Sequence, residues 1–322
     1  CTRISEGSVS ANLIYRGIYR TMPIQIKPAS CWKVAFYAAI SLLLVLSLPK
    51  KAAQAILPAH EEGTSVQMNA ILAKQWLLSS SNKQADTPLS FSVTYTPAET
   101  QRGQEVQDFL QEAQVFEQLL LGLNDVFVLP EPITLNQAEC GTVNAYYSPS
   151  DRQITMCYEL VDYFFTLFAE HRQPGDPPIE LPTISVLAFV MLHELGHGFI
   201  DVLDVPVLGR EEDAVDQFAA VLLAQTGGGQ VTAEAAATWF YLSSQQQDYA
   251  NIPYWAEHSL DIQRFHSIVC MLYGSSPETY GDLMQELDIP ERRQAMCQQE
   301  YADALENWGE ILDPIRIEPE AG

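Results

Sequence analysis

Two histidines four residues apart, His193 and His197, lie in the segment "FVMLHELGHGFIDV" with Glu194 directly after the first. If this segment is a helix, both imidazoles project from one face, where their ring nitrogens can meet one zinc ion at roughly 2.0–2.1 Å. Glu194 then lies about 100° around the helix, beside the ion rather than on it. A carboxylate placed there can act as general base on a metal-bound water. The H-E-x-x-H pattern therefore predicts a zinc site that hydrolyses an amide bond.

A catalytic zinc needs a third protein ligand and one open position. The segment "REEDAVDQFAA" follows a turn region that contains Pro206 and Gly209, so a second helix can fold back against the first. We expect Glu212 to be the third metal ligand. Asp216 is four residues later on the same helical face, where it can accept the free N–H of a zinc-bound histidine and fix its orientation.

Other interpretations of these residues remain open. Glu211 is a rival third ligand, but the residue four positions after it is Val215, which cannot support a histidine, and Asp213 points away at this spacing. A pair of histidines on a helix can also be incidental. The surrounding helix is otherwise apolar, however, so two histidines and a glutamate would be costly to bury there without a function.

The wider pattern resembles a known family. "HELGH" followed by E-x-x-x-D is similar to the gluzincin metallopeptidases. The longer set "ECGTVNAYY…ITMCYEL…LHELGHGFIDVLDVPVLGREEDAVDQFAA…EHSLDIQRF" resembles a bacterial family of putative metallopeptidases with a domain of unknown function. The resemblance covers most of residues 89–300. It implies an α+β, zincin-like domain, mostly helical with a small sheet and a β-hairpin before the active-site helix, and a zinc ion held by His193, His197 and Glu212.

Zincins usually also carry a donor that stabilises the oxyanion, located beyond the third ligand. We expect His258 in this role, because it follows a loop and begins a helix, so that its ring can point into the cleft. Asp261, three residues further on, could keep the imidazole charged. The other candidates, each of which could equally be an ordinary surface or core residue, are Tyr241, Tyr254, Arg264 and His266.

These features predict an exported zinc metallopeptidase that hydrolyses peptide bonds with a zinc-activated water, with Glu194 and His258 as catalytic residues. A strand of the predicted hairpin over residues 140–159 could bind the substrate by backbone pairing. Two alternatives are a non-proteolytic zinc-binding envelope protein, which the presence of Glu194 disfavours, and a zinc amidase that acts on cell-wall peptide. A protease assay with and without a chelator would separate the first alternative from an active enzyme.

The N-terminal region predicts export. Residues 22–55 combine a basic start, the apolar run Val34–Leu48 and the A-x-A site at residues 53–55, which is typical of a signal peptide. An uncleaved membrane anchor is the alternative, and it is the only membrane association that we expect. We take residues 1–21 as an upstream extension, 56–88 as a linker, 89–313 as the peptidase domain and 314–322 as a disordered tail. A periplasmic or secreted location follows.

The charge distribution excludes some partners. The chain has a net charge of −24, and residues 1–55 hold seven of its 17 Lys and Arg but only one of its 41 Asp and Glu. The remaining chain is therefore strongly acidic and repels nucleic acid and anionic lipid. We expect a peptide or protein substrate instead.

Four cysteines follow the predicted signal peptide, and an even number in an exported chain predicts two disulfides. A hairpin with residues 147–150 as its loop would place Cys140 opposite Cys157, which favours a Cys140–Cys157 bridge. Cys270 and Cys297 would form the second.

Hydrophobic periodicity predicts the remaining elements. We expect a strand over 89–97, helices over 98–127, 160–171, 183–203, 210–225, 231–247, 256–273 and 291–308, and loops at 248–255 and 274–281.

Overall fold

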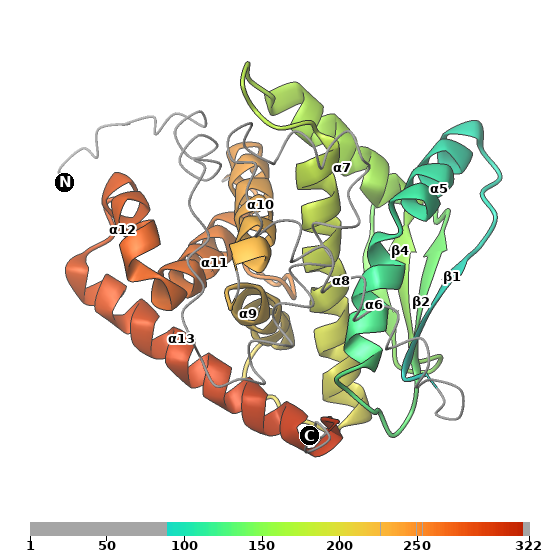
Figure 1. Ribbon diagram of the computed structural model, residues 1–322. Coiled ribbons are helices and arrows are strands. Elements are labelled where there is room, and N and C mark those ends of the chain that lie inside the picture. The colour runs from blue at the N-terminus through green and yellow to red at the C-terminus, as the bar shows by residue number, and fades with distance from the viewer. Residues whose placement is uncertain (1–88, 226, 249, 253, 318–322) are drawn as a thin grey trace, which may run out of the picture.

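The computed structural model describes residues 89–317 except 226, 249 and 253. The predicted extension, signal peptide and linker therefore lie outside the described residues. Within them, a small sheet and the helices α5 and α6 lie on one side of a central helix, α8 (Glu180–Val202), and the C-terminal helices lie on its other side (Figure 1). The domain is thus α+β and mostly helical, as predicted.

The sheet has four strands in the order β1-β2-β4-β3. The bounds are β1 Phe91–Tyr95, β2 Ile133–Ala138, β3 Ala145–Ser148 and β4 Gln153–Cys157. β1, β2 and β4 are parallel, with Phe91 paired to Ile133, whereas β3 runs antiparallel to β4 at one edge. Burial alternates along β2, so one of its faces packs against the core. β3 is consequently an edge strand whose second side is not paired within the sheet.

The helices of the described chain are α5 Gln101–Ala113, α6 Val115–Asn124, α7 Tyr158–His171, α8, α9 Glu211–Leu223, α10 Gly227–Gln245, α11 Asp261–Ser275, α12 Pro277–Glu286 and α13 Glu291–Leu312. A short 3-10 helix follows at Asp313–Ile315. α8 contacts the sheet as well as α7, α9 and α10, which makes it the helix that joins the two sides of the domain.

α8 is buried along nearly its whole length, as its apolar sequence predicts. By length and composition alone it could cross a membrane, but 94% of its most apolar window is buried within the protein. It therefore serves as a core helix here. The chain leaves it at Asp204, which has a positive φ of 52°, and returns as α9. Glu211, Glu212 and Asp213 occupy the first turn of α9, where the helix dipole favours negative charge.

Several expected boundaries were wrong. The single helix expected over 98–127 is two helices, because Gln114 adopts a left-handed conformation with φ 52° between them. β2 was not expected at all, and the expected loop at 274–281 contains the start of α12. The tail expected to be disordered from Pro314 is ordered up to residue 317, since the backbone N–H of Ile317 donates to the carbonyl of Val126.

Both expected disulfides are present, Cys140–Cys157 and Cys270–Cys297. The reason expected for the first was wrong. The hairpin spans 145–157 with its loop at 149–152, so Cys140 does not pair across it. Cys140 instead follows β2, whose last residue, Ala138, lies opposite Cys157 in the parallel neighbour β4.

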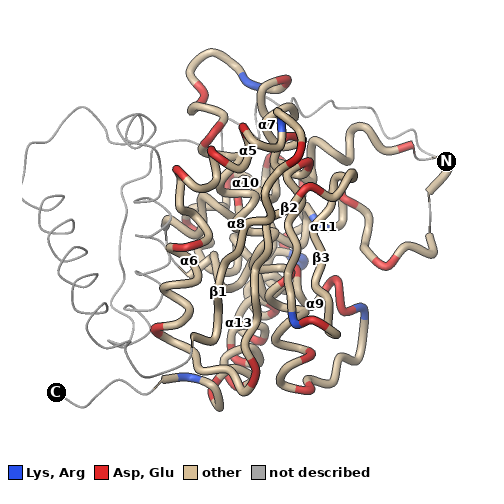
Figure 2. Tube along the Cα trace, turned by 90° about the vertical axis from the view of Figure 1, so that its right-hand side faces the viewer, with Lys and Arg blue, Asp and Glu red and all other residues tan. Residues whose placement is uncertain are grey.

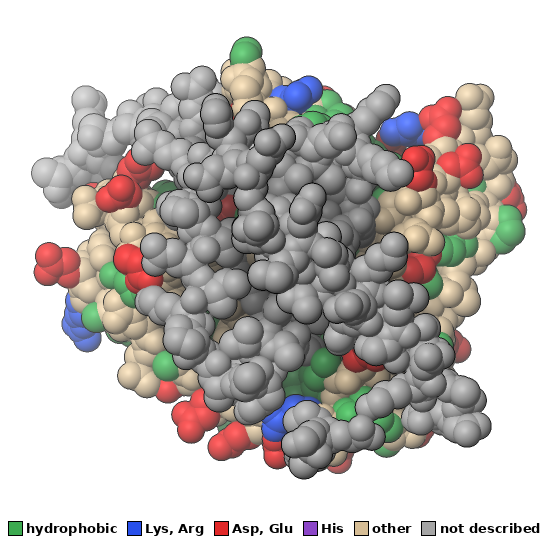
Figure 3. Space-filling model, in the orientation of Figure 1, with side chains coloured by type: hydrophobic (Ala, Val, Ile, Leu, Met, Phe, Trp, Pro, Cys, Tyr) green, Lys and Arg blue, Asp and Glu red, His purple; other side chains and the backbone are tan. Residues whose placement is uncertain are grey.

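The surface of the described region is acidic. Asp and Glu far outnumber Lys and Arg along the chain trace (Figure 2). Where the face drawn in Figure 3 shows coloured side chains, acidic ones occur at several separate places.

Candidate metal centre

The residues predicted as metal ligands come together where α8 and α9 pack side by side. His193 and His197 lie one turn apart on α8, and Glu212 and Asp216 lie one turn apart on α9. Gly196 permits this close packing, because a Cβ added there would lie 2.8 Å from a methyl carbon of Val215. A glycine between the two histidines thus lets the carboxylates of α9 reach them.

Three imidazoles surround one carboxylate oxygen. The Nε2 atoms of His193, His197 and His258 lie 3.2, 3.6 and 2.8 Å from Oε2 of Glu212. Oε2 is buried, and none of these contacts has full hydrogen-bond geometry. Nitrogen and carboxylate donors that converge without bonding one another fit a shared cation, and zinc takes this donor set. The residues present therefore fit a zinc ion.

The two α8 histidines are oriented through their other ring nitrogen. Nδ1 of His193 lies 2.8 Å from Oδ1 of Asp216, and Nδ1 of His197 lies 2.7 Å from Oε1 of Glu211. Both Nε2 atoms are therefore directed at the shared carboxylate of Glu212. Carboxylates that hold the second nitrogen in this way are the usual support of metal-binding histidines. Glu211, which the sequence suggested only as a rival ligand, is placed to orient His197.

Burial and charge pull in opposite directions at the site. Burial raises the pKa of Asp216, but the charge and hydrogen bonds of Arg264, with His193, outweigh it and lower this pKa to about 2. Burial lowers the pKa of His193, yet its hydrogen bond with Asp216 and its close contact with Glu212 raise it to about 9. For Glu212 the effect of burial is likewise overcome by the histidines, so its pKa is lowered. The carboxylates are thus held ionised, the form in which they bind cations.

Glu194 differs from the other carboxylates of the site. It is buried in α8, and burial raises its pKa, while the charges of His193, His197 and His258 act to lower it. A carboxylate with a raised pKa beside a cation site is suited to accept and return a proton near neutral pH.

The other candidates for the oxyanion donor lie in different surroundings. Tyr241 is buried against Phe265, His266 is partly buried beside the same ring, and Tyr254 is exposed. Arg264 binds Asp216 through two hydrogen bonds. His258 is the candidate that reaches Glu212, at 2.8 Å. It lies in the loop before α11 and not at the start of a helix as expected, and its ligand atom lies within 4.8 Å of those of His193 and Glu212. Asp261 was expected to keep the imidazole of His258 charged. The two groups interact through their charges, and burial is the largest influence on the pKa of Asp261, which it raises.

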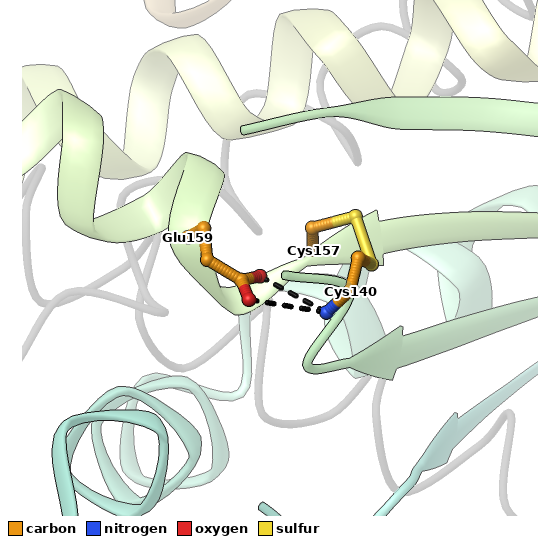
Figure 4. A group of neighbouring side chains, drawn as sticks. All are labelled: Cys140, Cys157 and Glu159. Carbon is orange, nitrogen blue, oxygen red and sulfur yellow. Dashed lines mark hydrogen bonds between the residues drawn. A yellow bond between two sulfur atoms is a disulfide. The ribbon is translucent and has the colours of Figure 1, made fainter. Parts of the chain in front are cut away.

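A second group of potential ligand atoms, Cys140, Cys157 and Glu159, has a structural role (Figure 4). The two sulfurs are joined in a disulfide. The carboxylate of Glu159 accepts hydrogen bonds from the backbone N–H groups of Cys140 and Gly141. Because these donors already occupy the carboxylate and the thiols are oxidised, this group stabilises the turn after β2 rather than binding a metal.

Comparison with known proteins bears on the family of the chain and not on its single residues. No curated protein and no solved structure matches the chain. A family model described as "Putative metallopeptidase" matches residues 95–312, which include strands β2 to β4, α8, α9 and the segment with His258. The match covers more than half of the chain, and the protein therefore belongs to this metallopeptidase family.

Proposed function

We propose that this protein is an exported zinc metallopeptidase that hydrolyses peptide bonds. The observation that carries the proposal is the convergence of three imidazole Nε2 atoms on the buried Oε2 of Glu212, next to Glu194. His193, His197 and Glu212 would hold the ion. A zinc ion bound there supplies a Lewis acid that polarises the scissile carbonyl and acidifies water.

The protein's own residues then carry the proton transfers. Glu194 takes a proton from the attacking water and delivers it to the leaving amine, for which its raised pKa is suited. His258 donates a hydrogen bond to the carbonyl oxygen as negative charge develops on it. Its Nε2 is near Glu212, and its side chain is 49% exposed, so it borders both the site and solvent.

The substrate would bind along β3. This edge strand lies beside the C-terminal half of α8, where the hydroxyl of Tyr147 donates to Asp201 at 2.8 Å. A Cβ added at Gly198 would lie 3.4 Å from the ring of Tyr147. The β3 side chain of Tyr147 therefore packs against α8 at the residue that follows His197. An extended peptide that pairs with the free side of β3 would place its backbone near the site.

Two disulfides support the location that we propose. Disulfide bonds persist in oxidising compartments, and this chain contains Cys140–Cys157 and Cys270–Cys297. A periplasmic or secreted protein would encounter such conditions.

The test is cleavage of a peptide library by the zinc-loaded protein, with and without a chelator. Glu194→Gln should keep the zinc and lower kcat by roughly 10²–10⁴-fold, because it removes only the base. Glu306→Gln, an exposed glutamate on α13, is the matched control and should be fully active. Full activity of Glu194→Gln would refute the mechanism. Zinc binding without cleavage of any peptide would favour the non-proteolytic alternative, and cleavage of cell-wall peptides alone would favour the amidase.

A further inference from the structure

Arg264 is held in one orientation by two other helices. It lies in the first turns of α11, and its side chain is only 11% exposed. Nε and Nη2 of its guanidinium lie 2.6 and 2.8 Å from the two carboxylate oxygens of Asp216 on α9. Its central carbon lies 4.0 Å from the centre of the Phe240 ring on α10. A planar, bidentate and stacked guanidinium is a geometry that lysine cannot reproduce.

The contact continues to the metal site. Oδ1 of Asp216, which accepts from Arg264, also lies 2.8 Å from Nδ1 of His193. Because Arg264 is always protonated, Asp216 beside it remains a carboxylate and can only accept hydrogen bonds. Nδ1 of His193 must then be the donor. In the neutral imidazole, the form that binds a metal, the lone pair of Nε2 then faces Glu212.

The two histidines of α8 differ in this respect. Glu211, which holds His197, has a side chain that is 46% exposed, whereas Asp216 is buried. A hydrogen bond to an exposed carboxylate is weakened by solvent, and a buried charge-assisted network is not. The support of His193 is therefore the stronger of the two, and it depends on Arg264 for its charge balance.

We infer that Arg264 is a positioning residue of the metal site, which acts through Asp216 to fix the orientation of the His193 ring. This inference rests on the proposed function, since it assumes that His193 binds a metal. Removal of the guanidinium would leave the buried Asp216 carboxylate without the two hydrogen bonds that fix its place, so that it no longer holds the His193 ring in one orientation. Arg264 would thus control metal affinity without touching the metal or the substrate.

The test measures zinc affinity by competition with a chromophoric chelator, independently of peptidase activity. Arg264→Gln and Arg264→Lys should each weaken zinc binding, the first by roughly 10–100-fold. Glu211→Gln should weaken it less. Arg293→Gln is the matched control, because Arg293 forms a similar pair of hydrogen bonds with Glu300 within α13. The zinc affinity of this variant should equal that of the wild type.

A double-mutant cycle distinguishes positioning from general stabilisation. If Arg264 acts through Asp216, adding Arg264→Gln to Asp216→Asn should cause little further loss of zinc affinity. Independent losses that multiply, or an unchanged affinity in both single variants of Arg264, would overturn the inference. If Arg264→Gln does not fold, Arg264→Lys carries the same comparison.

Failure of this inference is distinguishable from failure of the proposed function. If the wild-type protein binds zinc but cleaves no peptide, the proposed peptidase function is wrong and the inferred role of Arg264 still holds. If the wild-type protein binds no zinc, both the proposed function and the inference about Arg264 are wrong.

Discussion

At the scale of single residues, His258 differs from the other two histidines at Glu212. Nδ1 of His193 and of His197 each lies against a carboxylate, as metal-bound histidines almost always do. The contacts of the described residues include no such partner for Nδ1 of His258. Its ring stacks near that of His193, with centroids 6.0 Å apart, and is about half exposed. These features favour a hydrogen-bond donor over a third histidine ligand.

His258→Ala should lower kcat by about a hundredfold or more, because one oxyanion donor is lost. Zinc content and the circular dichroism spectrum should stay as in the wild type. Glu257→Gln, which changes the exposed neighbouring residue, should leave all three quantities unchanged. If zinc is lost together with activity, His258 is a ligand. If kcat is unaffected, it is not the donor, and Tyr241 or Tyr254 is the next variant to examine.

The part of the site that sequence could predict follows from helical spacing. His193 and His197, and likewise Glu212 and Asp216, are four residues apart, so each pair shares one face of its helix by spacing alone. Arg264 lies 48 positions from Asp216, and no local periodicity relates them. Glu211 was considered only as a ligand, because spacing within one helix does not show that its carboxylate reaches Nδ1 of a histidine on another.

At the scale of elements, α8 lies close to its neighbours on two sides because it carries two glycines. Cβ atoms added at Gly196 and Gly198 would lie 2.8 Å from Val215 of α9 and 2.7 Å from Ile133 of β2. The first glycine brings the carboxylates of α9 to the histidines, and the second brings the sheet close to the helix. The site therefore depends on where α9 packs as well as on which side chains it carries.

Gly196→Ala should weaken zinc binding and destabilise the fold by roughly 1–3 kcal/mol, because the added methyl group displaces α9 at Val215, next to Asp216. Thermal unfolding and chelator competition measure the two effects. Gly309→Ala in α13 is the control, since nothing lies within 4 Å of an added Cβ there. It should be neutral or stabilising, because alanine favours a helix more than glycine does. Equal behaviour of both variants would show that the α8–α9 contact tolerates a wider spacing.

Periodicity located most of the elements but not all of their ends. α8 and α9 were expected within a few residues of their bounds, because their apolar stripes are long. The break at Gln114 has no glycine or proline to signal it, since the left-handed residue is a glutamine. Strand β2 was not predicted, although its alternating apolar and polar residues are typical of a strand. The structure shows it paired with β1 on one side and β4 on the other.

At the scale of the whole molecule, the C-terminal helices pack against α9, one of the two helices that carry the candidate site. α11, which carries Arg264, packs against α9, α10 and α13 and is joined to α13 by the Cys270–Cys297 disulfide. The count of cysteines predicted that bridge, but it did not predict what the bridge supports. This helical side of the domain also contains a buried carboxylate that the proposed chemistry does not use, Glu234 of α10.

Glu234 links the stability of the fold to pH. It accepts a hydrogen bond of 2.7 Å from the hydroxyl of Tyr280 on α12, and burial, only partly opposed by that bond, raises its pKa to about 8. In the unfolded chain a glutamate has a pKa of about 4.3. Between these values the folded state holds a proton that the unfolded state has released. Glu234 therefore lowers the free energy of unfolding progressively as pH rises from about 4 to about 8.

Glu234→Gln should remove this dependence, because a neutral amide of similar shape can still accept the hydrogen bond from Tyr280. Urea unfolding at pH 5 and pH 8 measures the effect. At pH 8 the free energy of unfolding of the variant should exceed that of the wild type by on the order of 2–5 kcal/mol. At pH 5 the difference should be clearly smaller. Glu306→Gln, which changes an exposed residue of α13, should have the same free energy of unfolding as the wild type at pH 5 and at pH 8.

A difference between Glu234→Gln and the wild type that is the same at pH 5 and pH 8 would mean that Glu234 does not change its proton binding on folding. Its buried carboxyl group would then have to be ionised in the folded protein, by contacts stronger than the single bond from Tyr280.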